Sequence, residues 1–542
     1  MSQFKEKQVN MPYEYIYLLK DGIYKEEDEN QSYKIADYMA IKKVFMNIDT
    51  NDVIAEVEYD AFKKRHRITV PRTDYMNPLR LITYAGKGLD LVKGNIEDVV
   101  RHFRNQEEIA EIEYQHNNIG FGYYDDKEVY KLYNAVGVES TYCGQYDLEP
   151  KGYEDKYFQM LENEVLGHAP LELVLIMALS AVIIGYVGEE LSLDTLIIHL
   201  KGNSSTGKTT AVRLGISAFG YADTKRNGLV STYNATSNAL IGQLKGIKGV
   251  PFAFDELSMA QENDLTSVIY TIANGTDKAR LNANAELQMK GNWHTAVFST
   301  GEKSLIGSAK KNVGIQNRVI EIDDIVFTKD ASNAMRISST IQQNYGFLAY
   351  NFARYVLSIG KHECMSKYNT NYEEVLKIFR ENHIVDSFTE RRAKSFAAIV
   401  TTGKLAEQVL GKQFNWTEIW QILLCIEKKA LYRRSFDKVA IEQIKQYINI
   451  NIGKFARDSK CTGGTYWGKI IDKGDHMEVQ MLPNKFEMML KEQGFEDAQV
   501  VLKELKQGGY LNCEKDRYTR YRKTEAGFKA EVYVIKILKE LD

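Results

Sequence analysis

The spacing of apolar and polar residues divides the chain into segments of different structural type. Residues 1–115 contain short runs typical of strands, at 15–19, 53–59 and 80–84, separated by turn-forming pairs such as Asp21-Gly22 and Asn77-Pro78. We therefore expect a β-rich or α+β N-terminal domain over 1–115. Residues 116–189 begin with a further β-like stretch and continue with helical patterns, which predicts a connector leading into the next domain.

The most apolar stretch of the chain lies at the end of this connector. Residues 173–187 form 15 positions of nearly unbroken apolar character. A membrane-spanning helix needs about 18–20 such residues. The stretch therefore predicts a buried helix and no membrane contact.

The pattern changes again in the second half of the chain. Strands and helices alternate over 190–330, which indicates an α/β core with a parallel sheet, and helical spacing over 331–412 indicates a helical lid. The remainder, 413–542, ends in a helix, turn, helix and hairpin at about 484–525, which predicts a winged helix. A helical hairpin that docks a protein is the alternative, because winged folds also serve as adaptors.

A phosphate-binding loop follows the first strand of the α/β core. The strand-like run 195–200 leads into G-x-x-x-x-G-K-T, after which a helix is expected. Glycines let the backbone close around phosphate oxygens, and the unpaired amides of the helix face them. The predicted ATP-binding residues are Gly202, Asn203, Ser204, Ser205, Thr206, Gly207, Lys208, Thr209 and Thr210. We expect Lys208 to reach the β- and γ-phosphates and Thr209 to ligate Mg²⁺.

Two carboxylates end an apolar run about 45 residues further on. The run 250–254 is followed by Asp255 and Glu256, a Walker B pattern. One carboxylate is needed to hold the Mg²⁺ shell and its neighbour to orient and deprotonate a water. We assign Asp255 to the metal and Glu256 to the water.

Two further strands bring candidate catalytic side chains. The strand 294–298 runs into Ser299 and Thr300, either of which would sense the γ-phosphate or the water, although Ser-Thr turns also end ordinary strands. Arg318 precedes the apolar run 319–322, and an arginine supplied there to a neighbouring subunit would neutralise charge on the phosphoryl group. A surface salt bridge is the alternative role of Arg318.

The amino-acid composition bears on the type of protein and on the cellular compartment in which it is expected. The chain has 542 residues, 44% hydrophobic and 26% charged, with a net charge of −3, so any nucleic-acid contact must be local. The five cysteines, at 143, 364, 425, 461 and 513, form no C-x-x-C pair. We expect reduced thiols in a cytoplasmic protein, without structural zinc.

Taken together, these motifs resemble the AAA+ ATPases, and among them the MCM-like replicative helicases of mobile elements, in particular the helicase of staphylococcal cassette chromosome elements. The resemblance is carried by the segments 202–210, 233–240, 254–257, 273–275, 278–280 and 298–302. It implies an AAA+ P-loop core with inserted hairpins, a β-rich N-terminal collar that binds DNA, the lid and the winged helix. Members of the family that carry an N-terminal zinc module have cysteines that this chain lacks.

The resemblance also implies functional residues outside the phosphate loop. A hairpin at 276–292 would place Lys278, Arg280 and Lys290 on single-stranded DNA in the channel of a ring, expected to be a hexamer, although a solvated hairpin would also be charged. A second insertion is expected around Lys225 and Arg226. The lid would supply a second-sensor arginine, Arg391 or, one residue on, Arg392. The winged helix would contact duplex DNA through Lys503, Arg517, Arg520 and Arg522.

These expectations converge on an ATP- and Mg²⁺-dependent helicase that forms a homo-oligomeric ring, moves along single-stranded DNA and unwinds duplex DNA, with 3′ to 5′ movement implied by the resemblance. Two alternatives remain from the sequence. One is an ATP-dependent DNA-binding initiator or switch, and the other is an AAA+ protein remodeller, which favours apolar residues in the pore loop.

Overall fold

The computed structural model divides into two compact units, Met1–Leu148 and Glu149–Asp542. It describes residues 15–28, 31–262, 264–279, 281, 287, 290–308, 313–434, 436–457, 465–493, 495, 497–524 and 527–539.

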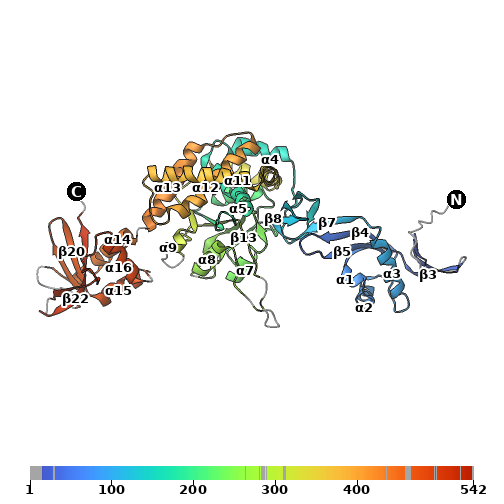
Figure 1. The fold of residues 1–542 in the computed structure, drawn as a ribbon, viewed down its shortest axis with the longest axis horizontal. Helices are drawn as coiled ribbons and strands as arrows, with labels where there is room; N and C mark the ends of the chain where they lie inside the picture. Colours follow the sequence, from blue (N-terminus) through green and yellow to red (C-terminus); the bar gives the residue numbers. More distant parts are fainter. Residues whose placement is uncertain are drawn as a thin grey trace. The chain divides into compact units, whose positions relative to one another are not determined.

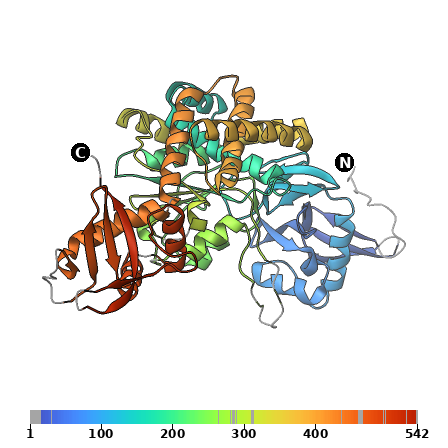
Figure 2. The ribbon, with the colours of Figure 1, turned by 60° about the vertical axis from the view of Figure 1, so that its left-hand side comes forward.

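The first unit is built mainly of strands. Strands β4 (Met39–Asn47), β5 (Val53–Ala61), β6 (Lys64–Pro71), β7 (Ile112–His116) and β11 (Ser140–Tyr142) form a sheet in the order β11-β7-β4-β5-β6. A three-stranded sheet contains β1 (Ile16–Leu19), β2 (Gly22–Asp28) and β3 (Gln31–Asp37), and β8 (Ile119–Tyr124) pairs with β9 (Lys127–Lys131), which pairs with β10 (Ala135–Val136). Helix α3 (Ile96–Glu107) packs on β4 and β1 (blue in Figure 2). The buried side of α3 includes Val99 and Phe103. They belong to an apolar core that this unit has of its own.

One strand-like run in this unit is helical. The run 80–84 was expected to be a strand, but α1 (Arg72–Tyr75), α2 (Pro78–Leu81) and a 3-10 helix at Ile82–Lys87 cover this region. The side chain of Asn77 accepts a hydrogen bond from the Leu79 amide at 3.0 Å, and Pro78 occupies the first helical turn. An asparagine cap followed by proline starts a helix, and these two residues outweigh the β-like composition that follows them.

The second unit contains a five-stranded parallel sheet, called the core sheet here. Its strands are β12 (Leu196–Lys201), β13 (Val230–Thr232), β15 (Phe252–Asp255), β16 (Ala296–Gly301) and β17 (Val319–Ile322), in the order β13-β15-β16-β12-β17. Nearly every position of β12, β16 and β17 is buried, as expected for parallel strands covered on both faces. The sheet has a carboxyl edge, where its strands end, and an amino edge, where they begin.

Helices surround the core sheet. They are α6 (Lys208–Ser217), α7 (Ser237–Gly242), α8 (Thr266–Asn274) and α9 (Val313–Gln316), preceded in the chain by α4 (Glu154–Met160) and α5 (Ala169–Val187). The short strand β14 (Ile247–Lys248) and a 3-10 turn at Leu257–Met259 complete this part. In Figure 1, α5 lies on one side of the sheet, and α7 and α8 lie on the other.

Helix α5 is the apolar stretch singled out in the sequence. It has 19 residues and a mean hydropathy of 2.2, enough by length and composition to cross a membrane, yet 89% of its most apolar window is buried inside the protein. The carboxylate of Glu172, at its start, accepts hydrogen bonds from the amides of Gly167 (2.7 Å) and Asn415 (2.9 Å), and burial raises the pKa of this carboxyl. The helix is therefore a central core element of this unit.

Four helices follow the core sheet: α10 (Ala331–Ile341), α11 (Leu348–Glu381), α12 (Thr389–Leu410) and α13 (Trp416–Arg434). Glu427 of α13 is fully buried and forms ion pairs with Arg392 of α12 (2.8 Å) and with Arg434 (2.7 Å). Arg433 pairs with Glu321 of β17 at 2.9 Å, and Arg392 donates to the carbonyl of Val319 at 3.2 Å. Helices α12 and α13 are thus fixed to the last strand of the core sheet.

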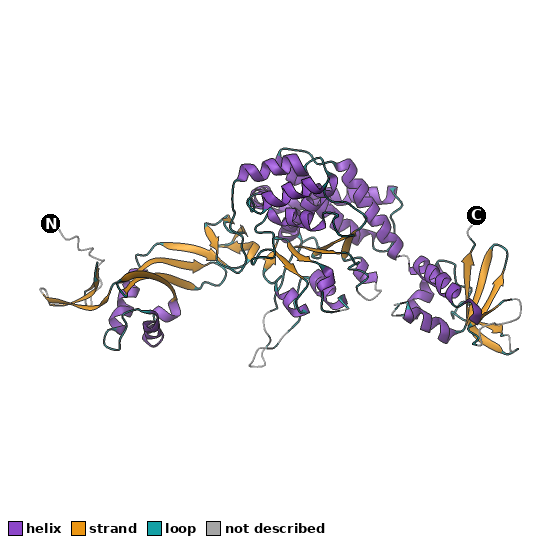
Figure 3. Ribbon diagram, turned by 180° about the vertical axis from the view of Figure 1, so that it is seen from behind, coloured by secondary structure: helices purple, strands orange, loops and turns teal. Residues whose placement is uncertain are grey.

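The C-terminal region has its own sheet and apolar core. It contains α14 (Phe436–Ile450), β18 (Phe455–Ala456), β19 (Gly468–Asp472), β20 (His476–Met481), α15 (Pro483–Glu492), α16 (Ala498–Gln507), β21 (Arg520–Lys523) and β22 (Lys529–Leu538), with a 3-10 turn at Ile452–Lys454. The sheet has the order β18-β19-β20-β22-β21, and the helices lie on one side of it (Figure 3). Helix, turn and helix follow one another as expected. The antiparallel pair differs from the prediction, because β21 pairs with β22, which ends at Leu538, beyond the expected limit of about 525. The sequence pattern also gave no indication of β18, β19 and β20.

The buried ion pairs of Glu427 with Arg392 and Arg434 should contribute strongly to stability. Glu427→Gln leaves the buried guanidinium groups of Arg392 and Arg434 without their shared counter-charge, and we expect the free energy of unfolding to fall by about 3–5 kcal/mol. The measurement is the thermal unfolding midpoint by differential scanning fluorimetry. Glu374→Gln is the matched control, because its ion pair with Lys404 is 42% exposed on both sides and is worth at most about 1 kcal/mol. Equal shifts for the two variants would contradict the prediction.

Candidate functional site

The phosphate loop joins β12 to α6 at the carboxyl edge of the core sheet. Its backbone adopts the left-handed conformation at Ser205 (φ 71°) and Gly207 (φ 81°). A Cβ atom on Gly207 would lie 2.6 Å from the Thr328 hydroxyl, so glycine is required there by space as well as by φ. The amide of Phe327 also donates to the carbonyl of Thr206 at 2.8 Å. The loop is therefore packed against the segment that enters α10.

Lys208 opens α6 and points back over the loop. Its Nζ donates to the carbonyls of Gly202 (2.8 Å) and Asn203 (2.7 Å). An ammonium group held by neutral carbonyls can exchange them for the charged oxygens of a phosphate, which bind it more strongly. The first amides of α6 have no partner within the helix and lie at the same place, so the loop has the composition of an anion site.

Asp255, at the end of β15, lies beside two hydroxyl groups. Thr300 Oγ1 donates to Asp255 Oδ1 at 2.5 Å, and Thr209 Oγ1 lies 3.4 Å from the same atom. Phe254 pairs with Ser299 across β15 and β16, so Asp255 and Thr300 come next and share a face. A carboxylate next to a hydroxyl is an oxygen donor set of the kind that Mg²⁺ prefers, so Asp255 and Thr209 fit the ion.

Glu256 follows in a constrained conformation. Its φ is 63°, in the left-handed region that bulky residues rarely adopt, and such strain is concentrated at functional sites. The amide of Glu256 donates to Thr300 Oγ1 at 3.1 Å, and the carboxylate accepts from Ser258 Oγ at 2.5 Å. Thr300 therefore fixes both consecutive acidic residues, one through its carboxylate and the other through its backbone.

Ser299 lies on the other face of β16 from Thr300. Tyr233 donates to Ser299 Oγ at 2.8 Å, Ser299 Oγ lies 2.8 Å from His199 Nδ1, and His199 Nε2 lies 2.9 Å from the carbonyl of Lys303. Burial lowers the pKa of His199 and raises that of Tyr233 to about 12, so both groups are neutral near pH 7. Nε2 of the neutral ring then donates to Lys303, and Nδ1 accepts from Ser299. Of the two sensor candidates, only Thr300 contacts the acidic pair.

Arg318 lies at the amino edge of the core sheet, immediately before β17. Val319 pairs with Ile197 at the start of β12, so Arg318 is at the opposite end of that strand from the phosphate loop. Its Nη1 donates to the carbonyl of Gly314 at 2.9 Å, and the guanidinium lies 4.7 Å from the centre of the Tyr270 ring. Burial and then the charge of Arg391 lower the pKa of Arg318.

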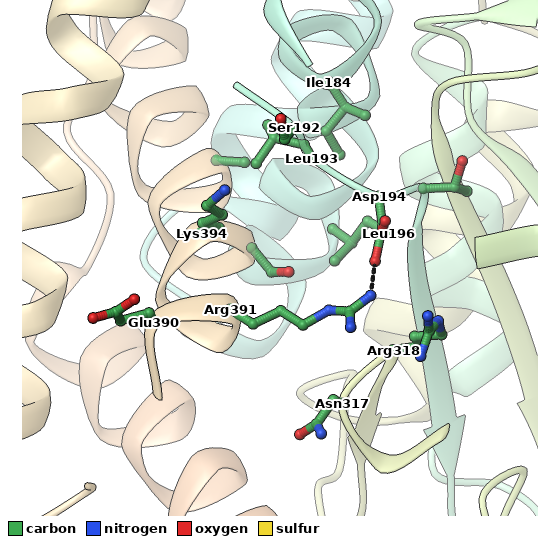
Figure 4. Close-up of a pocket in the computed structure, with 13 residues that line it drawn as sticks. Ile184, Ser192, Leu193, Asp194, Leu196, Asn317, Arg318, Glu390, Arg391 and Lys394 are labelled. Atoms are coloured by element: carbon green, nitrogen blue, oxygen red, sulfur yellow. Dashed lines mark hydrogen bonds and ion pairs between the residues drawn. The ribbon is translucent and has the colours of Figure 1, made fainter. Parts of the chain in front are cut away.

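Arg391 and Arg318 line one pocket of about 350 Å³, called the arginine pocket here (Figure 4). Arg391, in the first turn of α12, forms an ion pair with Asp194, the residue two positions before β12. Arg392 points elsewhere, into its buried pair with Glu427. The lid thus brings one of its two candidate arginines to Arg318 and uses the other in the core.

The predicted pore hairpin is described only in part. Antiparallel bridges join Thr276 to Asn292 and Leu281 to Leu287, and the buried carboxylate of Asp277 pairs with Lys245 Nζ at 2.8 Å. The basic candidates Lys278 and Lys290 are exposed, whereas Arg280 lies outside the described residues. Leu281 and Leu287 are also exposed, by 61% and 76%.

The remaining basic candidates lie on two separate surfaces. Lys225 and Arg226 belong to a turn between α6 and β13, where the Arg226 guanidinium lies 5.0 Å from the Tyr221 ring centre. In the C-terminal region, Lys503 is exposed on α16, and the other three cations lie in or beside β21. Arg517 pairs with Glu514 at 2.7 Å, while Arg520 and Arg522 donate to the carbonyls of Cys513 and Tyr521, both at 3.1 Å.

Sequence reasoning missed several residues that shape these sites. Asp194 and Ser258 are ordinary surface types in sequence, and nothing in their surroundings indicates their partners. His199 carried a usable signal, because an ionisable residue inside a fully apolar strand has to be hydrogen-bonded when buried. Glu302, which accepts from Ser204 of the phosphate loop at 2.6 Å, follows Thr300 closely and was not singled out.

Two protein families and a solved structure are similar to this chain. The family described as "Domain of unknown function (DUF927)" matches residues 17–292, and the one described as "Cch helix turn helix domain" matches residues 435–540. A solved structure titled "SCCmec type IV Cch - active helicase" aligns with a TM-score of 0.78 at 24% identity, covering 96% of this chain and 97% of the other. Curated proteins give no match. The resemblance predicted from the sequence is confirmed, and at this identity it shows a common fold.

The two neighbours on β16 give a matched pair of variants. Thr300→Val removes the hydroxyl that holds Asp255 and the Glu256 amide. We expect the rate of nucleotide hydrolysis to fall about tenfold or more, while the affinity for nucleotide stays equal to that of the parent. Ser299→Ala leaves the buried groups of Tyr233 and His199 unpaired, and it is expected to lower stability by about 1–3 kcal/mol with little change in hydrolysis. Phosphate release, binding of a fluorescent ATP analogue and thermal unfolding check both variants. The opposite pattern would move the sensor role to Ser299.

Proposed function

The chain belongs to the DUF927 family, and from the site at the carboxyl edge of its core sheet we propose that it is an ATP-dependent DNA helicase that unwinds duplex DNA during replication of a mobile genetic element. The observation that carries the proposal is the convergence of Lys208, Thr209, Asp255 and Thr300 where α6 begins. We assign the core to the AAA+ class, because β16 lies between the phosphate-loop strand and the strand of the acidic pair.

The proposed roles follow from the contacts of each group. Lys208 and the α6 amides would neutralise the phosphate chain, and Thr209 and Asp255 would hold Mg²⁺, which would supply further positive charge against the phosphoryl group. Glu256 accepts a proton from the attacking water, and Thr300 holds the carboxylate of Asp255 and the backbone amide of Glu256. Glu256 is exposed, so a general base at this position can reach solvent.

We propose that the active unit is a ring of copies, expected to be a hexamer. Arg318 and Arg391 lie at the amino edge of the sheet and the phosphate loop at its carboxyl edge, so one copy does not bring its own pocket to its own nucleotide. A neighbouring copy can supply them. An arginine that stabilises the transition state in this way makes hydrolysis depend on assembly.

DNA binding is assigned to three surfaces: the 276–292 hairpin, the turn with Lys225 and Arg226, and the C-terminal helix-turn-helix. Support comes from the exposed cations Lys278 and Lys290, from the match of residues 435–540 and from the fold shared with a protein titled an active helicase. Phosphate contacts by lysine are independent of sequence, which suits movement along a single strand. Movement from 3′ to 5′ and recognition of duplex DNA by a winged C-terminal domain are part of the proposal.

One observation favours a second candidate function. Leu281 and Leu287 are exposed on the same hairpin as Lys278, and apolar pore residues suit a motor that pulls on a polypeptide. A protein remodeller therefore remains a competing proposal.

Strand displacement separates these functions. We expect the parent to release the labelled strand of a forked duplex when ATP and Mg²⁺ are present, Lys208→Ala to lose nucleotide binding and displacement, and Glu256→Gln to bind ATP but hydrolyse it at least about a hundredfold more slowly. The readouts are gel-resolved strand release and phosphate production. Robust hydrolysis by the parent with a fork that stays paired would favour the remodeller or the switch.

Mixing subunits tests the shared site. Arg318→Ala copies are mixed with parent copies at constant total concentration, and we expect hydrolysis to fall more steeply than the mutant fraction, because each mutant copy disables its neighbour's site. Arg101→Ala is the control, since this arginine is 56% exposed in the first unit. A strictly proportional fall would contradict hydrolysis at sites shared between copies.

A further inference from the structure

The arginine pocket contains buried polar groups that lack partners. Asn317 is only 4% exposed, yet neither Oδ1 nor Nδ2 has a hydrogen-bond partner among the described residues. The Thr195 hydroxyl and the Nε of Arg318 are in the same state, and all three residues line the pocket. Buried polar groups are nearly always hydrogen-bonded in folded proteins. Three of these atoms, Asn317 Nδ2, Thr195 Oγ1 and Arg318 Nε, can donate hydrogen bonds, and together they fit a ligand with several oxygen acceptors.

The charges that line the pocket indicate that the ligand is an anion. The cations are Arg318, Arg391 and Lys394, and the carboxylates are Asp194 and Glu390. Lys394 Nζ donates to the carbonyl of Leu191 at 3.2 Å, so its charge is not neutralised by that contact. Positive charge and amide and hydroxyl donors, gathered in about 350 Å³, match a phosphate group.

Asp194 already forms an ion pair with one of the two arginines of the pocket, Arg391. Its carboxylate pairs with Arg391, and the two side chains are 42% and 41% exposed. A carboxylate offers a guanidinium the same pair of oxygen acceptors that a phosphate offers, but with less charge. Half-exposed ion pairs are weak, so a phosphate brought to the pocket can displace Asp194 from Arg391.

The proposed function brings the terminal phosphate of the nucleotide held by a second copy of this chain to the arginine pocket. We infer that Asn317 donates a hydrogen bond to that phosphate, and that Asp194 takes the place of the phosphate on Arg391 until the copies meet. The inference rests on the proposed function, and it adds Asn317 as a contact and Asp194 as an internal competitor. In a free copy, the ion pair with Asp194 keeps Arg391 at the pocket. On assembly, Arg391 leaves the Asp194 carboxylate and binds the phosphate.

Removing the competitor is the first test. The hydrolysis rate of full-length protein is measured over a range of protein concentrations with saturating ATP. Asp194→Asn is expected to lower the concentration of half-maximal rate by about two- to fivefold, the equivalent of a half-exposed ion pair, without lowering the maximal rate. Glu374→Gln is the matched control: its ion pair with Lys404 is exposed to the same extent, 42% on both sides, but Glu374 does not line the pocket, so this variant should not move the curve.

The second test concerns Asn317. Asn317→Ala removes no hydrogen bond that is present within a free copy, so its thermal midpoint should equal or exceed that of the parent. We expect the maximal rate to fall about tenfold or more, as for a lost hydrogen bond to a charged group, with unchanged binding of a fluorescent ATP analogue. In mixtures with parent copies, it should act on its neighbours as Arg318→Ala does.

Each outcome has one meaning. If the parent rate per copy does not depend on protein concentration, the shared site itself is wrong and the proposed function changes. If the parent does depend on concentration but Asp194→Asn matches Glu374→Gln, or loses maximal rate, then Asp194 is not a competitor. An Asn317→Ala variant that loses stability but keeps its maximal rate would show that Asn317 is structural.

Discussion

The hydrogen bond from Thr300 to Asp255 exists only because β16 lies between β12 and β15, and the candidate hydrolytic site depends on it. The middle strand brings one hydroxyl within 2.5 Å of the first carboxylate and 3.1 Å of the backbone of the second. On its other face, the same strand uses Ser299 in a neutral chain with Tyr233 and His199. A single strand thus supplies the hydroxyl that contacts the acidic pair on one face and core hydrogen bonds on the other.

Two groups of basic residues lie at opposite edges of the parallel sheet, one strand length apart. Phosphate-loop amides and Lys208 lie at the carboxyl edge, and Arg318 and Arg391 lie at the amino edge. Helix α13 holds the second arrangement together, because Arg433 pairs with Glu321 of β17 while Glu427 pairs with Arg392 of α12. The strand that positions Arg318 and the helix that positions Arg391 are thereby fixed to a common support.

The sequence was sufficient to predict those features whose residues are adjacent in the chain and are flanked by a clear strand or helix pattern. The phosphate loop, the strand before Asp255 and the helix-turn-helix order could all be predicted, because each depends on neighbours within a few residues. Ser299 and Thr300 could not be distinguished, since their difference is which face of a strand they occupy. The helix at 80–84 was missed because the cap at Asn77 decided the local structure against its composition.

Long-range pairing was beyond sequence reasoning altogether. Asp194 and Arg391 are separated by 197 positions, and Arg392, with the same chemistry, takes a buried partner instead. The two arginines are adjacent in α12 and about 100° apart around the helix axis, so they face different surroundings. The sequence alone did not show which of the two lines the pocket.

The contact between the phosphate loop and the start of the lid has a mechanical consequence. Gly207 has no room for even one extra carbon against Thr328, and the Phe327 amide is bonded to the loop at Thr206. The loop and the segment before α10 are therefore in direct contact, so a movement of one would displace the other. Binding of a ligand at the proposed nucleotide site would in this way shift α10, the first helix after the core sheet, through these contacts.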